Sequence, residues 1–171
     1  YIGCAGGCDT NLIWRLDTAT VDSSVGACRI VVEGLRGGHS GGDIHENRAN
    51  AIKLLARVLA RVEPGKLRLV ELVGGSKRNA IPREAHAIVA GSLDAIKTLQ
   101  QAADTVAAEA RAESFEEGVR IKSESVDRAG LKAASTERTD AIIAAMIALP
   151  NGALGMHPRV PNLVQTSNNV S

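Results

Sequence analysis

The chain has 171 residues, enough for one domain with a hydrophobic core of its own. Hydrophobic residues make up 44% of it and aromatic residues only 2%, so we expect a core of Ala, Val, Ile and Leu side chains. The formal net charge is +1, with basic and acidic residues interleaved, which argues against a nucleic-acid-binding surface. No apolar run approaches the ~20 residues of a membrane-spanning helix.

Hydrophobic periodicity predicts strands and helices in alternation. Strands are predicted where apolar and polar residues alternate, as around Ile30, and helices where apolar residues recur at helical spacing, as around Leu55. In chain order, these are a short strand at 10–17, a strand at 27–35, a helix at about 46–62, strands at 67–73 and 84–90, a helix at about 93–111, a strand at 119–126, a helix at about 136–149 and an extended segment at about 162–170.

The order βαββαβ is that of a ferredoxin-like unit, so we predict an α+β fold with an antiparallel sheet and helices on one face, extended by an extra helix and strand. We expect a single domain over 1–171, with its core at about 26–126 and an extension at about 127–171. The last extended segment pairs either with the same sheet or with a strand beyond Ser171. The start at Tyr1, without Met, looks like an internal point of a longer polypeptide.

Three cysteines, Cys4, Cys8 and Cys28, are interpreted as small buried hydrophobic residues. Their odd number and the lack of a signal peptide indicate reduced thiols in a cytoplasmic protein. Cys4 and Cys8 have a spacing typical of metal ligands, but a structural zinc ion needs four ligands and no second pair follows nearby. We therefore predict no metal site within this chain.

A glycine-rich segment at 34–47 is the most unusual part of the sequence. Its glycines let the backbone turn sharply and approach a ligand closely. It carries His39 and His45, and the residues alone leave two interpretations open. The segment is either a connector with solvated histidines or a junction that holds a histidine against a substrate. Its spacing fits neither a P-loop nor a dinucleotide-binding fingerprint.

A second polar segment, at 74–84, connects two predicted strands and carries Arg78 and Asn79. Arg and Asn side chains can hold a carboxylate, but taken alone the segment is better explained as an ordinary turn. Glu116 and Glu117 have no His or Asp partner nearby in the sequence and are predicted to be solvated. His86, within a strand, is interpreted as structural. His157, in a loop, is not part of any recognisable group of catalytic residues.

Several segments together resemble the lid, or dimerisation, domain of aminoacyl-histidine dipeptidases, also called cytosol nonspecific or carnosinase-type dipeptidases. The similar segments follow the family order and span nearly the whole chain: 1–7, 34–45, 78–85, 149–152 and 163–168. The resemblance implies a metallopeptidase whose catalytic domain binds two zinc ions and is interrupted in sequence by the lid. A metal-bound water attacks the dipeptide carbonyl, with a Glu of that domain as general base, and the lid closes over the site.

The resemblance also implies roles for lid residues. The histidine that donates to the oxyanion is His39 by position, with His45 as the alternative. Asn79 is the substrate-binding Asn, and Arg78 is a weak substitute for a substrate-binding Arg expected beyond Ser171.

The family's metal ligands have no counterparts in this sequence. It contains four His and no His-x-Asp pair, so we expect the chain alone neither to bind the two zinc ions nor to hydrolyse dipeptides. The implied partners are the catalytic domain of the parent, a dipeptide substrate and a second copy bound through the lid. The alternative is a stand-alone ferredoxin-like regulatory module that binds a small molecule.

Overall fold

A four-stranded antiparallel sheet forms the centre of the computed structural model, which describes residues 6–114 and 116–171. The strand order is β4-β6-β2-β7, and each helix of the unit crosses between strands that are not neighbours. The elements of the unit are β2 (Gly26–Glu33), α1 (Ala51–Leu59), β4 (Leu67–Gly74), β6 (Ala85–Gly91), α2 (Leu93–Ser114) and β7 (Arg120–Ser125). The predicted βαββαβ order and the ferredoxin-like α+β fold class are confirmed.

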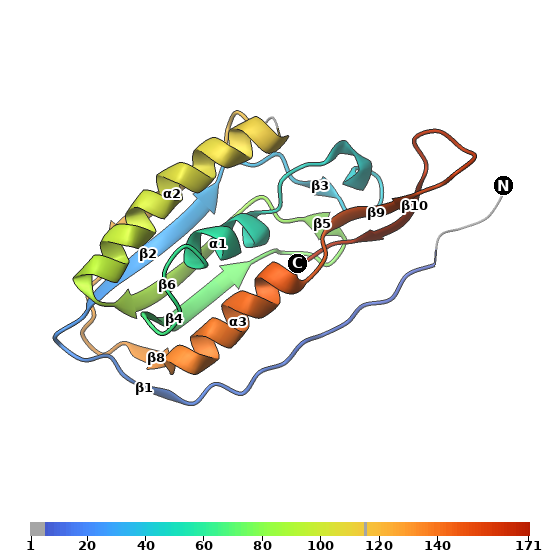
Figure 1. Ribbon diagram of the computed structural model, residues 1–171. Helices are drawn as coiled ribbons and strands as arrows, with labels where there is room; N and C mark the ends of the chain where they lie inside the picture. The colour runs from blue at the N-terminus through green and yellow to red at the C-terminus, as the bar shows by residue number, and fades with distance from the viewer. Residues whose placement is uncertain (1–5, 115) are drawn as a thin grey trace.

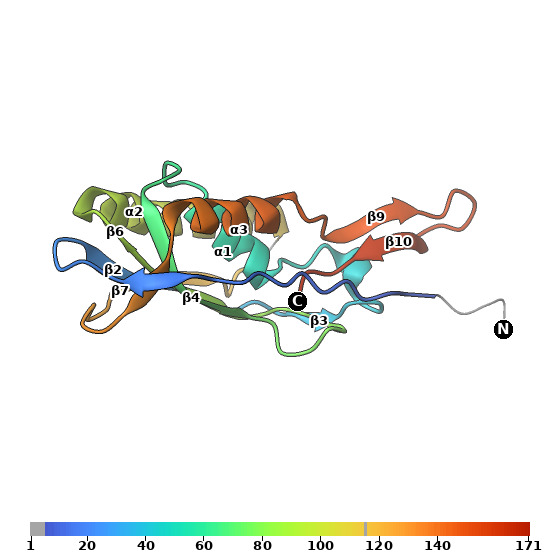
Figure 2. The same cartoon turned by 90° about the horizontal axis from the view of Figure 1, so that it is seen from below.

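The helices pack on one face of this sheet, where α3 (Thr136–Ala148) joins α1 and α2 (Figures 1 and 2). Strand β2 shows why the sequence folds this way, because Cys28, Ile30 and Val32 are fully buried and the residues between them are only half-buried. The core is aliphatic, as predicted. Each large side chain in it, such as Leu55 or Leu99, contributes about 1.5–3 kcal/mol by leaving water.

Short antiparallel pairs surround the main sheet: β1 (Thr18–Thr20) with β8 (Lys132–Ala134), β3 (Gly38–His39) with β5 (Ala80–Ile81), and β9 (Gly152–Met156) with β10 (Val164–Asn168). The strand predicted at 10–17 is wrong, because these residues are exposed and pairing begins only at Thr18. The prediction that the last extended segment pairs with the main sheet is wrong. Within the described residues it pairs with β9, whose two glycines weaken the strand pattern in the sequence.

Helix α1 begins at Ala51, later than the predicted start near residue 46. The preceding residues form a single 3-10 turn, η1 (Ile44–Glu46), and Asn47 then adopts a left-handed conformation with φ 53°. The side chain of Asn50 accepts the backbone N–H groups two and three residues further on and so caps the helix. The residues before Asn50 are therefore released from the helix and belong to the glycine-rich loop.

The burial of two residues, Cys8 and Glu116, differs from the prediction. Cys8 is exposed, whereas Cys28 is buried as predicted, and burial raises the pKa of its thiol. The prediction for Cys4 lies outside the described residues. Glu116, predicted to be solvated, is only 1% exposed, because its carboxylate accepts backbone N–H groups from a loop distant in the sequence.

An ion cluster joins α1 to α2 and predicts a pH dependence of stability. Arg57 lies 2.6 Å from carboxylate oxygens of both Glu109 and Glu113, and these hydrogen bonds hold the pKa of each carboxyl below its usual range. A carboxyl group whose pKa is lower in the folded than in the unfolded state stabilises the fold at pH values above its unfolded-state pKa, which is about 4.3 for Glu. That stabilisation is lost as the pH falls through the folded-state pKa.

We therefore expect the free energy of unfolding, measured by urea titration, to fall as the pH decreases below the unfolded-state pKa of about 4.3, and to fall less in Arg57→Met. Lys97→Met, at an exposed position of α2, is the matched control and should keep the wild-type slope. Equal slopes in all three proteins would contradict the assignment.

Candidate functional site

The two polar segments singled out in the sequence meet beyond one end of the main sheet. Strand β3 pairs with β5 so that His39 faces Ala80, and the N–H of Ser40 donates to the carbonyl of Asn79 over 2.9 Å. His39 and Asn79 are both exposed. The pairing therefore brings the two predicted site residues together at a surface open to solvent.

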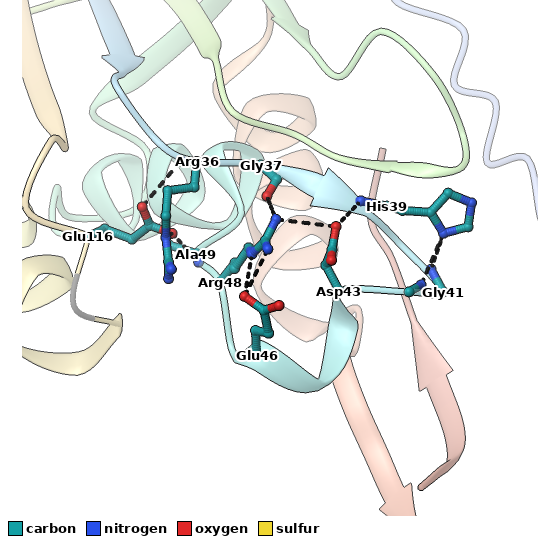
Figure 3. Close-up of polar contacts among 10 residues, drawn as sticks. Arg36, Gly37, His39, Gly41, Asp43, Glu46, Arg48, Ala49 and Glu116 are labelled. Atoms are coloured by element: carbon teal, nitrogen blue, oxygen red, sulfur yellow. Dashed lines mark hydrogen bonds and ion pairs between the residues drawn. The ribbon is translucent and has the colours of Figure 1, made fainter. Parts of the chain in front are cut away.

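The hydrogen bonds of the His39 ring define its tautomer. Its Nδ1 accepts the backbone N–H groups of Gly41 and Gly42, each over 3.0 Å (Figure 3). A ring nitrogen that accepts a hydrogen bond carries a lone pair, so the neutral ring holds its proton on Nε2. A Cβ at position 41 would lie 3.3 Å from Cε1 of His39, so glycine there lets the backbone approach the ring. Nε2 is thus the nitrogen through which His39 can donate.

A guanidinium group cross-links the loop behind His39. Arg48 donates to the carbonyl of Gly37 over 2.6 Å and lies 3.2 Å from the carboxylate of Asp43 (Figure 3). Asp43 in turn accepts the N–H of His39 over 2.7 Å. Arg48 also forms a two-pronged contact with Glu46, and chiefly this hydrogen bond raises the pKa of Arg48 above its usual value. The backbone at His39 is therefore held by a charged network rather than by apolar packing.

The other predicted site residues lie close by but outside the β3–β5 pairing. His45 is exposed on η1. Arg78, immediately before Asn79, is exposed and forms an ion pair of 2.9 Å with Asp9. The structure thus places Arg78 beside Asn79 along the chain, with its guanidinium directed to the N-terminal segment.

The remaining histidines have local partners. His86 lies on β6 with its Nε2 2.7 Å from a carboxylate oxygen of Glu71 on β4, which fits the structural role predicted for it. In the connection between β9 and β10, Nδ1 of His157 accepts the N–H groups of Arg159 and Val160. His157 therefore repeats the ring geometry of His39 at a different place in the fold.

Several residues of this region were not predicted from the sequence. Asn169 donates from its side chain to the carbonyl of Ala80 over 2.9 Å and so ties the end of the chain to β5. Asp43, Arg48 and Glu116 hold the loop of His39. The one signal for Asn169 was its position directly after the similar segment at 163–168; the other three gave none, because their contacts depend on the tertiary fold.

A cavity of about 660 Å³ opens beside the β3–β5 pair. Four basic and two acidic side chains are among its lining residues: Arg29, Arg36, Lys77, Arg83, Glu33 and Glu84. This excess of positive charge suits an anionic group. Gly38 and Ala80, the chain neighbours of His39 and Asn79, are among the lining residues, whereas His39 and Asn79 themselves are not.

Metal ligands do not gather in the part of the chain that the structure describes. Within residues 6–114 and 116–171, no three His, Cys, Asp or Glu side chains converge on a point that a metal ion could occupy. The residues present therefore do not fit a two-metal centre. Among the same residues, no helix combines the length and the hydrophobicity needed to cross a membrane.

Comparisons with known proteins give consistent matches. The profile of the family described as "Peptidase dimerisation domain" matches residues 30–117. The cytosol non-specific dipeptidase of Escherichia coli (strain K12) is 38% identical over 175 residues, which cover 99% of this chain and 36% of that protein. The crystal structure of aminoacylhistidine dipeptidase from Vibrio alginolyticus matches with a TM-score of 0.83 and 35% identity, over 92% of this chain and 32% of that one. The chain thus spans about a third of the length of these relatives.

Proposed function

This chain belongs to the peptidase dimerisation domain family, and we propose that it is the lid of a metal-dependent dipeptidase whose catalytic domain lies elsewhere in the parent polypeptide. The resemblance indicated by the motifs is confirmed by the similarity to two dipeptidases. The observation that supports the proposal is the exposed His39, whose Nδ1 accepts two N–H groups and so leaves Nε2–H free to donate, in a strand that pairs with the segment next to Asn79. Family membership favours this function over a stand-alone regulatory module.

His39 would stabilise the oxyanion that develops on the scissile carbonyl of the dipeptide. Its Nε2–H is the donor, and the two N–H groups on Nδ1 keep the ring in this tautomer without rearrangement during the reaction. The metal centre, which would polarise the carbonyl and activate water, belongs to the catalytic domain. The part contributed by this chain is therefore a preoriented hydrogen-bond donor delivered by lid closure.

Substrate binding is proposed for Asn79, with Arg78 and His45 as secondary candidates. The amide of Asn79 would contact the dipeptide, either Xaa-His or another sequence, and the basic lining of the neighbouring cavity suits the terminal carboxylate. A further substrate-binding Arg is proposed beyond Ser171. The whole chain is proposed to act as one lid domain, with its core at about 26–126, its extension at about 127–171 and a homodimer contact, in a cytoplasmic enzyme.

The parent enzyme tests this function. We expect the full-length protein, loaded with zinc, to hydrolyse Xaa-His dipeptides and to lose that activity on chelation, because the metal supplies the activated water. The 171-residue chain alone should show neither turnover nor stoichiometric zinc binding. Metal-independent cleavage by the parent, or turnover by the isolated chain, would contradict the proposal.

A further inference from the structure

Glu116 is a buried carboxylate outside both segments of the site. Its side chain is only 1% exposed, and an ionised carboxylate in such a place costs several kcal/mol unless donors surround it. Three groups do: the N–H of Arg36 donates at 3.2 Å, the N–H of Ala49 donates at 3.3 Å, and Nε of Arg36 forms an ion pair at 3.4 Å. Two of the three are backbone groups, so the contact constrains the course of the main chain.

These two backbone donors stand at the two ends of the loop that carries His39. Arg36 precedes the loop and Ala49 follows it, and one carboxylate accepts from both, one oxygen for each (Figure 3). Inside the loop, Arg48 holds Gly37, and Arg48 and Asp43 together continue the chain of contacts to the N–H of His39. Glu116 is therefore connected to His39 through the backbone next to Arg36 and Ala49, and from there through the hydrogen bonds and the ion pair of Arg48 and Asp43.

We propose that Glu116 is a positioning residue, which closes the 36–49 loop at both ends and so fixes the direction in which His39 presents its Nε2–H. The inference rests on the function proposed above for His39. A carboxylate suits this role because both of its oxygens accept, whereas a Gln amide would turn an NH2 group toward one of the two N–H donors. Released at one end, the loop would no longer hold the Gly41 and Gly42 N–H groups against Nδ1.

The direct test is nitrogen NMR of the histidine rings in the 171-residue chain. We expect wild-type His39 to show a single Nε2–H tautomer, and Glu116→Gln to show a mixture of tautomers together with about tenfold faster amide exchange at Gly41 and Gly42. Glu117→Gln is the matched control, since Glu117 is its exposed neighbour. A Glu116→Gln spectrum equal to the wild type at His39, with unchanged exchange, would overturn the inference.

A second variant is needed in case the first one does not fold. If Glu116→Gln does not fold, Glu116→Asp, which keeps the charge and shortens the reach, is judged by the same two readouts. Unfolding of both variants would also overturn the inference, because Glu116 would then stabilise the fold as a whole rather than orient the loop.

Kinetics of the full-length parent separate this inference from the proposed function. Displacement of a catalytic group by about 1 Å can lower the rate on the order of 100-fold, so we expect Glu116→Gln to lower kcat at least tenfold and to leave KM within about twofold. If the NMR changes appear but neither Glu116→Gln nor His39→Ala affects kcat, the role of His39 fails and the positioning stands. If His39→Ala abolishes turnover and Glu116→Gln leaves the ring unchanged, only the positioning fails.

Discussion

Replacing His39 with Ala in the full-length parent is expected to lower kcat by about 100- to 1,000-fold, the usual cost of losing one oxyanion donor. KM should change by less than about threefold, because the contact proposed for Nε2 would strengthen only as negative charge develops in the transition state. Steady-state kinetics with an Xaa-His dipeptide measure both values. Asn79→Ala should instead act mainly on KM, because the contact proposed for its amide would already be made by the bound substrate.

Two other histidines provide controls for this experiment. His157→Ala removes a ring whose Nδ1 also accepts two backbone N–H groups, so it is matched to His39 in local geometry, and it should keep the wild-type kcat. His45→Ala tests the alternative assignment, since His45 is exposed on η1 within the same segment. A large loss of kcat in His45→Ala, with near-normal turnover in His39→Ala, would transfer the oxyanion role to His45.

Much of the fold was predictable because its strands and helices bury one face at the expected period. Strand β2 alternates fully buried and half-buried residues, and α1 places Leu55 and Leu59 against the sheet. Local pattern fails where pairing depends on tertiary position, as in β3, which has only Gly38 and His39. Its partner, β5, follows α1 and β4 in the sequence, and no hydrophobic periodicity indicates a contact between segments so far apart in the chain.

The candidate site was predictable only in outline. Glycine content indicated a sharp turn at 34–47, but the choice of His39 and Asn79 came from the family resemblance. The acceptor role of Nδ1 depends on backbone N–H groups that no sequence pattern reveals. Glu116 was misassigned for the same reason, because its partners Arg36 and Ala49 are separated from it by 80 and 67 residues.

Gly38→Ala is the substitution within the loop that we expect to be most disruptive to its structure. Gly38 has φ 147°, a conformation that L-residues rarely adopt. A Cβ at this position would overlap the guanidinium of Arg48 and lie 2.5 Å from the carboxylate of Asp43. The variant must therefore displace the groups that hold the carbonyl of Gly37 and the N–H of His39.

We expect Gly38→Ala to lower the free energy of unfolding of the chain by about 1–3 kcal/mol, the cost of one strained residue, and to lower kcat of the parent at least tenfold by misorienting His39. Gly42→Ala is the matched control in the same loop: its Cβ would lie 3.7 Å from Cβ of His39, an ordinary contact, and its N–H to Nδ1 is retained. Urea titration and steady-state kinetics compare the two. Equal stability and turnover in both variants would show that the Arg48 and Asp43 network does not determine the geometry at His39, and the orientation of the ring would then have to come from the catalytic domain.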